Sequence, residues 1–217
     1  MHKTVQNLID IENQLKFSLG DQSSLPKIIA VSKTFKVDKI SPLVEHGHLD
    51  FGENKVQEAI DKWTEIKANM PNIQLHMIGK LQTNKVKFAV KLFDYIHSVD
   101  SEKLAKKIAD EQLKVKRRIK IFIQVNIGDE TQKSGININE TNNLVAFCKK
   151  LNLNVVGFMC IPPADTDPSS YFEEMDKINK INNFKELSMG MSSDYIKAAR
   201  HNSTYLRIGS NIFGQRY

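Results

Sequence analysis

The sequence predicts an α/β protein built as a single (β/α)8 TIM barrel with one extra helix at the N-terminus. Short runs rich in Ile, Val and Phe alternate with amphipathic segments along the 217 residues, a pattern typical of parallel strands joined by helices. There are eight such runs. The turn after the first run reads SKTFKVD and lacks the glycines that a doubly wound nucleotide-binding sheet usually carries there. The barrel is therefore favoured over that open sheet, which stays the alternative.

The expected elements follow in order along the chain. The strands are predicted at 27–31, 49–52, 74–78, 95–99, 119–126, 154–159, 186–189 and 205–208. Helices are predicted at 4–19 before the first strand and then at 36–46, 54–69, 82–93, 101–115, 139–151, 169–183 and 193–202. Ser101 and Asn139 are the expected N-caps of their helices. The prolines at 26, 71, 162 and 163 fall between elements, where a missing N–H costs little.

Length and composition predict one domain over residues 1–217, with residues 1–20 as a helix packed on the barrel. Hydrophobic residues make up 41% and charged residues 26% of the sequence, which excludes disordered and fibrous classes. No stretch is apolar for long enough to span a membrane. The N-terminus lacks the apolar core and cleavage site of a signal peptide, so we expect a cytoplasmic protein. Cys148 and Cys160 have no metal-ligand spacing, and we expect them to be buried and no metal to be bound.

The net charge of +6 raises the alternative of a nucleic-acid-binding protein. The densest basic stretch, 103–118, is interleaved with Asp110 and Glu111 at helical spacing. No nucleic-acid motif accompanies it. A solvated helix face explains this stretch better, and we expect no nucleic-acid partner.

In a (β/α)8 barrel, function gathers at the carboxyl ends of the strands. The first strand runs directly into Ser32 and Lys33, and alternation puts Ile29, Val31 and Lys33 on one face. A lysine that follows two apolar residues into a barrel mouth is costly unless it is used. Desolvation lowers the pKa of such an amine and makes it a nucleophile towards carbonyls. The alternative is a lysine whose amine reaches out to water.

The last two strand ends predict a phosphate site. Small residues, hydroxyls and glycines follow the seventh strand in LSMGMSSD and the eighth in RIGSNIFG, where barrels commonly bind phosphate and where a short helix is expected to start. Tyr205, Arg207 and Gly209 share a face, so the charge of Arg207 should point into the barrel mouth. It would either face a cofactor ring or pair with Glu53 or another carboxylate at the mouth.

Polar residues also follow the other strands. His76 alone would more often be a hydrogen-bonded core histidine than a catalyst, but with Gln82, Asn84 and Lys85 after it we expect it to form a polar wall of the pocket. Lys133 follows the fifth strand, and we expect it to be exposed to solvent rather than closing over the mouth.

Seven motifs in order, AVSKT, FGENKVQEA, HMIGKLQTNK, IHSVDS, QVNIGDETQKSG, LSMGMSSDY and RIGSNIFGQRY, resemble the YggS/PROSC family of pyridoxal 5'-phosphate homeostasis proteins. The resemblance covers residues 28–217. It implies a barrel of the alanine racemase N-terminal kind, fold type III among pyridoxal phosphate (PLP) proteins. It also implies PLP as the cofactor, held as a Schiff base.

By the resemblance, Lys33 looks like the Schiff-base lysine, and Arg207 looks like the group that faces the pyridine nitrogen. Ser188, Gly209 and Ser210 look like the phosphate cradle, with Ser192 as a further candidate. Asn54 is expected near the ring. Some members carry a second lysine two places after the first, where this sequence has Phe35, so a role in cofactor transfer assigned to that lysine does not carry over.

The resemblance implies a PLP-binding protein that stores, shields or delivers the cofactor inside the cell, without catalysis of its own. The alternative is a racemase or decarboxylase of the same fold type. Such enzymes generally add a β-domain with a second acid/base group, and proton exchange on both faces of a cofactor needs two such groups. We expect PLP as ligand and PLP-dependent apoenzymes as possible recipients. We also expect no membrane contact, and a monomer, because a closed barrel has no sheet edge to pair.

Overall fold

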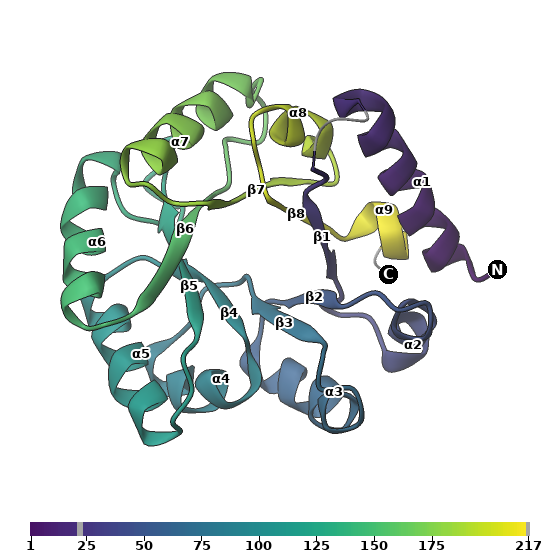
Figure 1. Cartoon of the computed structure of the whole chain (residues 1–217), viewed down its shortest axis with the longest axis horizontal. Coiled ribbons are helices and arrows are strands. Elements are labelled where there is room, and N and C mark those ends of the chain that lie inside the picture. Colours follow the sequence, from purple (N-terminus) through teal and green to yellow (C-terminus); the bar gives the residue numbers. More distant parts are fainter. Residues whose placement is uncertain (21–23, 216–217) are drawn as a thin grey trace.

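The computed structural model describes residues 1–20 and 24–215 and contains a closed parallel barrel in the order β1 to β8, with β8 paired to β1 (Figure 1). The strands are β1 Lys27–Val31, β2 Asp50–Glu53, β3 Gln74–Met77, β4 Tyr95–Val99, β5 Lys120–Val125, β6 Asn154–Cys160, β7 Glu186–Met191 and β8 Tyr205–Ile208. The predicted fold class is confirmed, and each strand lies within two residues of its predicted bounds.

The helices surround the barrel, with α1 before β1, α9 after β8 and the others between consecutive strands (Figure 1). They are α1 Lys3–Leu19, α2 Val37–Glu45, α3 Val56–Asn69, α4 Val86–Leu92, α5 Glu102–Lys114, α6 Thr141–Lys150, α7 Ser169–Ile181, α8 Tyr195–Arg200 and α9 Ser210–Phe213. The short helix expected after the eighth strand is α9. Two 3-10 turns, η1 Thr83–Lys85 and η2 Ile138–Glu140, precede α4 and α6.

The two predicted N-caps have different outcomes. Ser101 caps α5, since its hydroxyl accepts a hydrogen bond from the Leu104 N–H. The prediction for Asn139 is wrong, because Asn137 accepts from the Asn139 N–H and caps η2 instead. The helix begins earlier than predicted as a 3-10 turn. The last two residues of the sequence, Arg216 and Tyr217, and residues 21–23 of the predicted domain lie outside the described residues.

Two apolar layers hold the barrel together. Most buried side chains lie between the strands and the helices, among them Phe51 and Trp63, whose rings are 4.7 Å apart. A smaller cluster fills the barrel interior and contains Ile29, Tyr95, Phe122, Met159 and Tyr205. Cys148 and Cys160 are fully buried, as predicted, and burial raises the pKa of each thiol to about 12.

The N-terminal helix α1 packs beside the end of the chain. It buries Leu8 and Leu15 against the barrel and lies next to α8 and α9 (Figure 1). The side-chain amide of Asn7 donates to the Ile212 carbonyl over 2.9 Å. α1 therefore covers the segment of the chain that follows β8.

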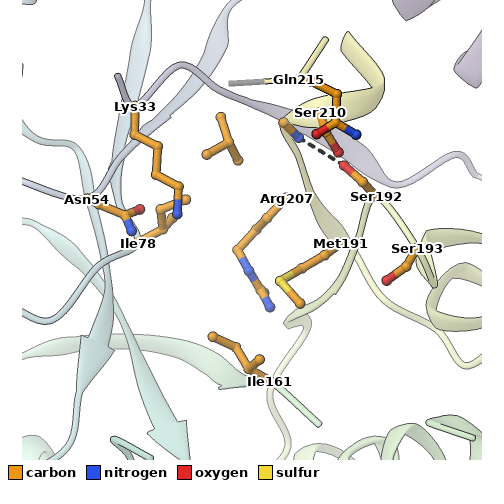
Figure 2. Close-up of a pocket in the computed structure, with 12 residues that line it drawn as sticks. Lys33, Asn54, Ile78, Ile161, Met191, Ser192, Ser193, Arg207, Ser210 and Gln215 are labelled. Atoms are coloured by element: carbon orange, nitrogen blue, oxygen red, sulfur yellow. Dashed lines mark hydrogen bonds between the residues drawn. The ribbon is translucent and has the colours of Figure 1, made fainter. Parts of the chain in front are cut away.

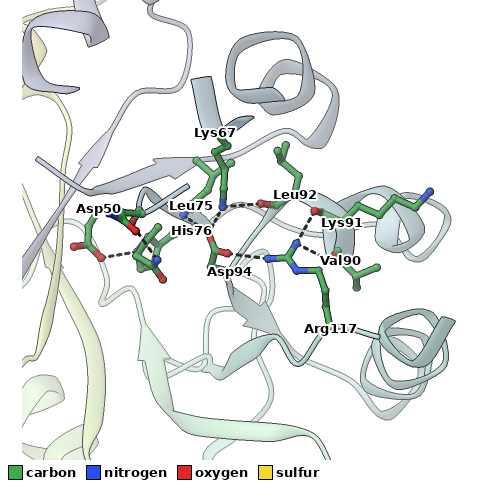
Figure 3. A network of polar contacts seen from close by, with 11 residues as sticks. Asp50, Lys67, Leu75, His76, Val90, Lys91, Leu92, Asp94 and Arg117 are labelled. Carbon is green, nitrogen blue, oxygen red and sulfur yellow. Dashed lines mark hydrogen bonds and ion pairs between the residues drawn. The ribbon is translucent and has the colours of Figure 1, made fainter. Parts of the chain in front are cut away.

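A carboxylate at the amino end of β4 joins several outer elements (Figure 3). Asp94 pairs with Lys67 of α3 and with Arg117 after α5, and it accepts a hydrogen bond from the Leu75 N–H of β3. Arg117 also donates to carbonyls at the end of α4. Part of the predicted basic face is thus used within the fold. Among the residues described, no helix is both long and apolar enough to cross a bilayer.

Candidate functional site: a cavity at the barrel mouth

A cavity of about 590 Å³ lies at the carboxyl ends of the strands, where function was expected. Six of the seven predicted site residues line it, namely Lys33, Asn54, Ser192, Arg207, Gly209 and Ser210. Figure 2 shows Lys33 and Asn54 on one wall and Ser192 and Ser210 on the opposite wall, with Arg207 between them. The volume lies within the range of small-molecule sites.

The end of β1 carries Lys33 into this cavity. Ile29 lies in the barrel interior, and Val31 and Lys33 line the cavity above it. The alternation predicted from the sequence is therefore confirmed. Thr34 then adopts a left-handed backbone conformation with φ of 69°, which ends the strand and turns the chain towards α2.

A largely covered lysine on α3, Lys62, holds the loop that carries Lys33. The Lys62 amine donates to the Ser32 carbonyl over 2.8 Å and to the Phe35 carbonyl over 3.3 Å. It also pairs with Glu53 at 2.6 Å and with Glu58 at 2.9 Å. The loop around Lys33 is thus fixed from both sides. The pKa of Glu58 is raised by burial but lowered more by its bonds from Lys62 and the Thr34 N–H, so the net shift is downwards.

Glu53 lies beneath α3 and does not reach the cavity. Its side chain is fully buried, and one carboxylate oxygen accepts from the Ser32 hydroxyl and the Trp63 indole as well as pairing with Lys62. Glu53 makes no pair with Arg207, so the expected alternative of an Arg207–Glu53 pair is wrong. The reason is strand alternation, because Glu53 follows Gly52 and points outwards while Gly52 points into the barrel.

Asn54 is held at the mouth by the chain that follows β3. A side chain at Gly79 would place its Cβ 2.4 Å from the Asn54 carbonyl oxygen, so only glycine allows this close approach. The backbone of Asn54 therefore has a rigid support on one side, and its amide lies on the same wall as Lys33 (Figure 2).

The opposite wall is formed by the ends of β7 and β8. The Gly209 N–H donates to the Ser192 hydroxyl over 3.3 Å (Figure 2), and the Asn211 amide donates to the Ser192 carbonyl. Asp194 accepts a hydrogen bond from the Met191 N–H and closes the turn that presents Ser192. α9 begins at Ser210, and first-turn amides of a helix have no partner within the helix. Hydroxyls and backbone N–H groups are therefore grouped on one wall, as a phosphate requires.

Arg207 is a buried cation at the floor of the cavity. It is 5% exposed, and its guanidinium donates to the Ser188 hydroxyl over 2.6 Å and to the Cys160 carbonyl over 2.8 Å. Burial lowers its pKa, but an arginine remains charged at neutral pH. These bonds use two of its five N–H donors.

Two sequence expectations place residues in the wrong layer of the barrel. Ser188 does not line the cavity, since it is fully buried below it and contacts Arg207 and His97. Ser188 pairs with Tyr205, one layer below Arg207, and Met191 lies opposite Arg207. His76 is also fully buried inside the barrel, hydrogen-bonded to Asp50 and His97, and is no wall of the pocket.

The loop residues expected with His76 lie elsewhere too. Gln82 and Lys85 line a separate cavity outside the barrel mouth, and Asn84 lines another beside α5. Lys133 is only 27% exposed, pairs with Glu130 and donates to the Pro162 carbonyl over 3.0 Å. The expectation of a freely solvated Lys133 is therefore wrong.

Five further lining residues were not predicted from the sequence. They are Ile78, Ile161, Met191, Ser193 and Gln215. For Ile78 and Ile161 the signal was available, because each directly follows a strand and shares the inward face of that strand. No comparable pattern marks Gln215, which lies after α9.

The residues present suit a flat aldehyde that carries a phosphate. An amine, a buried guanidinium and a wall of hydroxyls and amides line three parts of one cavity, and Ile78, Ile161 and Met191 offer apolar contact to a ring. This donor set matches the groups of PLP, which combine an aldehyde, an aromatic nitrogen and a phosphate. Cofactors of this kind carry the reactive chemistry, and the protein supplies binding and electrostatics.

Fold and cavity define a class of protein, the parallel barrels of the alanine racemase N-terminal type. A family model described as alanine racemase, N-terminal domain, matches residues 18–217. An alanine racemase structure from Clostridium difficile 630 is similar in fold, with a TM-score of 0.74 at 15% identity over 99% of this chain and 57% of that one.

Relatives of similar length narrow this class. The pyridoxal phosphate homeostasis protein of Vibrio alginolyticus is 33% identical over 100% of this chain and 99% of its own. That of Escherichia coli strain K12 is 31% identical over 100% and 98%. The structure of PipY from Synechococcus elongatus PCC7942 with PLP bound has a TM-score of 0.86 at 31% identity, covering 97% of this chain and 100% of PipY. The chain belongs to the family of the pyridoxal phosphate homeostasis proteins.

Proposed function

We propose that this protein binds pyridoxal 5'-phosphate reversibly at Lys33 and stores, shields or delivers it within the cell. One observation carries the proposal: Lys33, Arg207 and the Ser192 and Ser210 hydroxyls line three parts of the same cavity. The homeostasis proteins named above and PipY, solved with PLP bound, support it. The whole chain, residues 1–217, would act as one PLP-binding domain.

Each lining residue has a role in this proposal. Lys33 forms the Schiff base with the cofactor aldehyde. Ser192, Gly209 and Ser210 bind the phosphate, and Arg207 faces the ring nitrogen and keeps it unprotonated. Asn54 lies beside the ring. Ser188, expected in the phosphate cradle, is assigned a different task, because its hydroxyl already bonds to Arg207 and His97 below the cavity.

We also propose that the protein has no catalytic activity of its own. Among the described residues that line the cavity, Lys33 and Arg207 are the only two with side chains that ionise. A racemase needs an acid/base group on each face of the cofactor, and an arginine does not lose its proton at neutral pH. This composition supports a carrier over the alternative, a racemase or decarboxylase.

Absorption spectroscopy tests the proposal. Purified protein is titrated with PLP, and the visible band of the bound cofactor is recorded for the wild type, for Lys33→Ala and for Lys36→Ala, an exposed lysine nearby. We expect one PLP per chain in the wild type and in Lys36→Ala, and no visible band in Lys33→Ala. A band of equal strength in all three proteins contradicts the assignment of Lys33. Turnover of D- or L-alanine by the loaded protein would establish the alternative.

Three finer predictions belong to this proposal. They are a cytoplasmic location, a monomeric protein, and transfer of PLP to apoenzymes. Sedimentation of the loaded and unloaded protein checks the second. For the third, a PLP-dependent apoenzyme is mixed with loaded protein, and its activity should recover faster than with the same concentration of loaded Lys36→Ala protein denatured beforehand.

A further inference from the structure

A chain of hydrogen bonds runs through the barrel interior from the cavity to the opposite end of the barrel. Arg207 bonds to Ser188 over 2.6 Å, Ser188 to His97 over 2.9 Å, His97 to His76 over 2.9 Å and His76 to Asp50 over 3.0 Å. The side chains of the two histidines and of Ser188 are fully buried. Figure 3 shows the Asp50 and His76 end of this chain, which we call the interior chain.

With both histidines neutral, the two ends of the interior chain give every bond in it one direction. An arginine can only donate, an ionised carboxylate can only accept, and a neutral imidazole donates from one nitrogen and accepts at the other. His76 therefore donates from Nε2 to the Asp50 carboxylate and accepts at Nδ1 from Nε2 of His97. Nδ1 of His97 then accepts from the Ser188 hydroxyl, which itself accepts from Arg207. Each histidine has one defined tautomer in this arrangement.

The electrostatics agree with this arrangement. Burial lowers the pKa of His76, although Asp50 opposes the shift, and burial together with the charges of His76 and Arg207 lowers the pKa of His97. Burial raises the pKa of Asp50, but its bond from His76 and nearby positive charges outweigh this, so the net shift is downwards.

Charged groups outside the interior chain reach it from several elements. Lys27 of β1 and His48 act on Asp50, and Lys27 and Asp94 act on His76. Asp194 and the Cys160 thiol act on Arg207. None of these groups takes part in the hydrogen bonds of the chain itself.

We propose that His97, His76 and Asp50 are positioning residues for the cofactor, which act through Ser188 to fix the Arg207 guanidinium and its charge at the ring nitrogen. The inference rests on the proposed function. The His97 ring stacks on Phe122 with centroids 4.3 Å apart, and the His76 ring stacks on Tyr95 at 4.4 Å. Neither imidazole can rotate without disturbing this packing, so the interior chain holds Ser188 and thereby Arg207 in one orientation.

A different role for the same residues is to satisfy one another's polar groups inside the barrel, with no effect on the cofactor. The two roles predict different results when the interior chain is altered at Asp50, its end far from the cavity. Asp50→Asn keeps an acceptor for His76 but removes the negative charge at the far end. The cofactor responds to this change only if the interior chain fixes the position of the Arg207 charge.

The test uses the full-length protein loaded with PLP. Two quantities are measured for each variant: the Kd of PLP, and the pH midpoint of the visible band of the bound cofactor. Ser188→Ala and His97→Phe should weaken PLP binding about tenfold, as expected for the loss of one hydrogen bond to a buried charge. They should also move the midpoint to lower pH, because a loosened Arg207 lets the ring nitrogen take up a proton, which withdraws electrons from the nitrogen joined to Lys33.

The controls separate this effect from general damage to the barrel. Tyr205→Phe removes a buried hydrogen bond to Tyr95 in the same interior but leaves the interior chain complete, and it should keep the wild-type Kd and midpoint. His97→Gln can restore an acceptor for Ser188 and should recover part of the loss seen in His97→Phe. Asp50→Asn is the mildest change. It should shift the midpoint, and a thermal unfolding transition should show that the variant is still folded.

The outcomes distinguish this inference from the proposed function. If the wild type shows no PLP bound at Lys33, the proposed function fails. If the wild type binds PLP at Lys33 while folded Ser188→Ala and Asp50→Asn keep its Kd and midpoint, the positioning role is refuted. A shift of equal size in Tyr205→Phe also refutes it, because the effect would then not depend on the interior chain.

Discussion

Removing Lys62 should destabilise the protein more than removing any exposed lysine, because the amine of Lys62 neutralises a fully buried carboxylate. The side chain of Lys62 is 11% exposed and that of Glu53 is 0% exposed, and their charged atoms are 2.6 Å apart. Lys62→Met leaves Glu53 charged and buried with only the Ser32 and Trp63 donors. Breaking a buried pair in this way costs about 3–5 kcal/mol.

The expected change in melting temperature follows from this free energy. For a protein of this size, 1 kcal/mol corresponds to a shift of about 2–4 °C, so Lys62→Met should lower the Tm by roughly 10 °C. The double variant Lys62→Met with Glu53→Gln removes both charges and should recover about half of the loss. Lys177→Met is the matched control, since Lys177 pairs with Glu173 on the exposed surface, and this substitution should leave the Tm close to that of the wild type.

Urea unfolding of the four proteins measures these free energies directly. The double variant should still bind PLP more weakly than the wild type, because the bonds from Lys62 to the Ser32 and Phe35 carbonyls are not restored. The reasoning is refuted if Glu53→Gln gives no recovery in the Lys62→Met background, since the cost would then not come from an uncompensated charge.

Three more predictions concern other parts of the molecule. His48, His76 and His97 have pKa values lowered by burial, so below about pH 6.5 the unfolded chain binds more protons than the folded protein. The urea concentration at the unfolding midpoint should therefore rise from pH 5 to 7 and then level off. A flat profile would contradict neutral buried histidines. Gly190→Ala should cost more than Gly47→Ala although both glycines have φ near +90°, because only at Gly190 does the new Cβ meet another atom, Cβ of Ala198 at 2.5 Å; equal Tm values would contradict the clash. Cys148 and Cys160 have thiol pKa values raised by burial to about 12, so neither should react with a thiol reagent at pH 8 until the protein unfolds, and rapid labelling of the folded protein would show that they are accessible.

The fold and the main site residues could be predicted because both depend on periodic patterns. Eight apolar runs separated by amphipathic segments predict the barrel, and alternation along the first and last strands places Lys33 and Arg207 at its mouth. These predictions need only local chain geometry. They hold because β1 and β8 are regular at the positions that matter, with Ile29 paired to Arg207 in register.

The remaining errors come from properties that a linear pattern does not contain. Ser188 was placed at the cavity, but it pairs with Tyr205 of the barrel interior, one layer below Arg207. The residue opposite Arg207 is Met191, because the register of β7 against β8 shifts after Ser188, and no residue type announces this shift. Lys62 lies 29 positions after Lys33 on a helix, where a lysine ordinarily predicts solvent exposure. Its burial depends on tertiary packing of α3 over the end of β1.

His76 is a different case, because the alternation of side chains along its strand already predicts its place in the barrel interior. Gln74, His76 and Ile78 share one face by alternation, and Ile78 lines the cavity. His76 must therefore lie one layer deeper in the barrel, where it meets His97 from the next strand. Layering of alternate strands inside a barrel predicts such contacts.

The most direct test of the account is to map where PLP is attached. The protein is incubated with PLP, reduced with borohydride, digested and analysed by mass spectrometry, with Lys33→Ala and Lys36→Ala treated in the same way. The account predicts one modified residue, Lys33, in the wild type and in Lys36→Ala. In Lys33→Ala, no residue should be modified to the extent that Lys33 is in the wild type. A wild-type protein that is unmodified, or that is modified mainly at any other lysine, contradicts it.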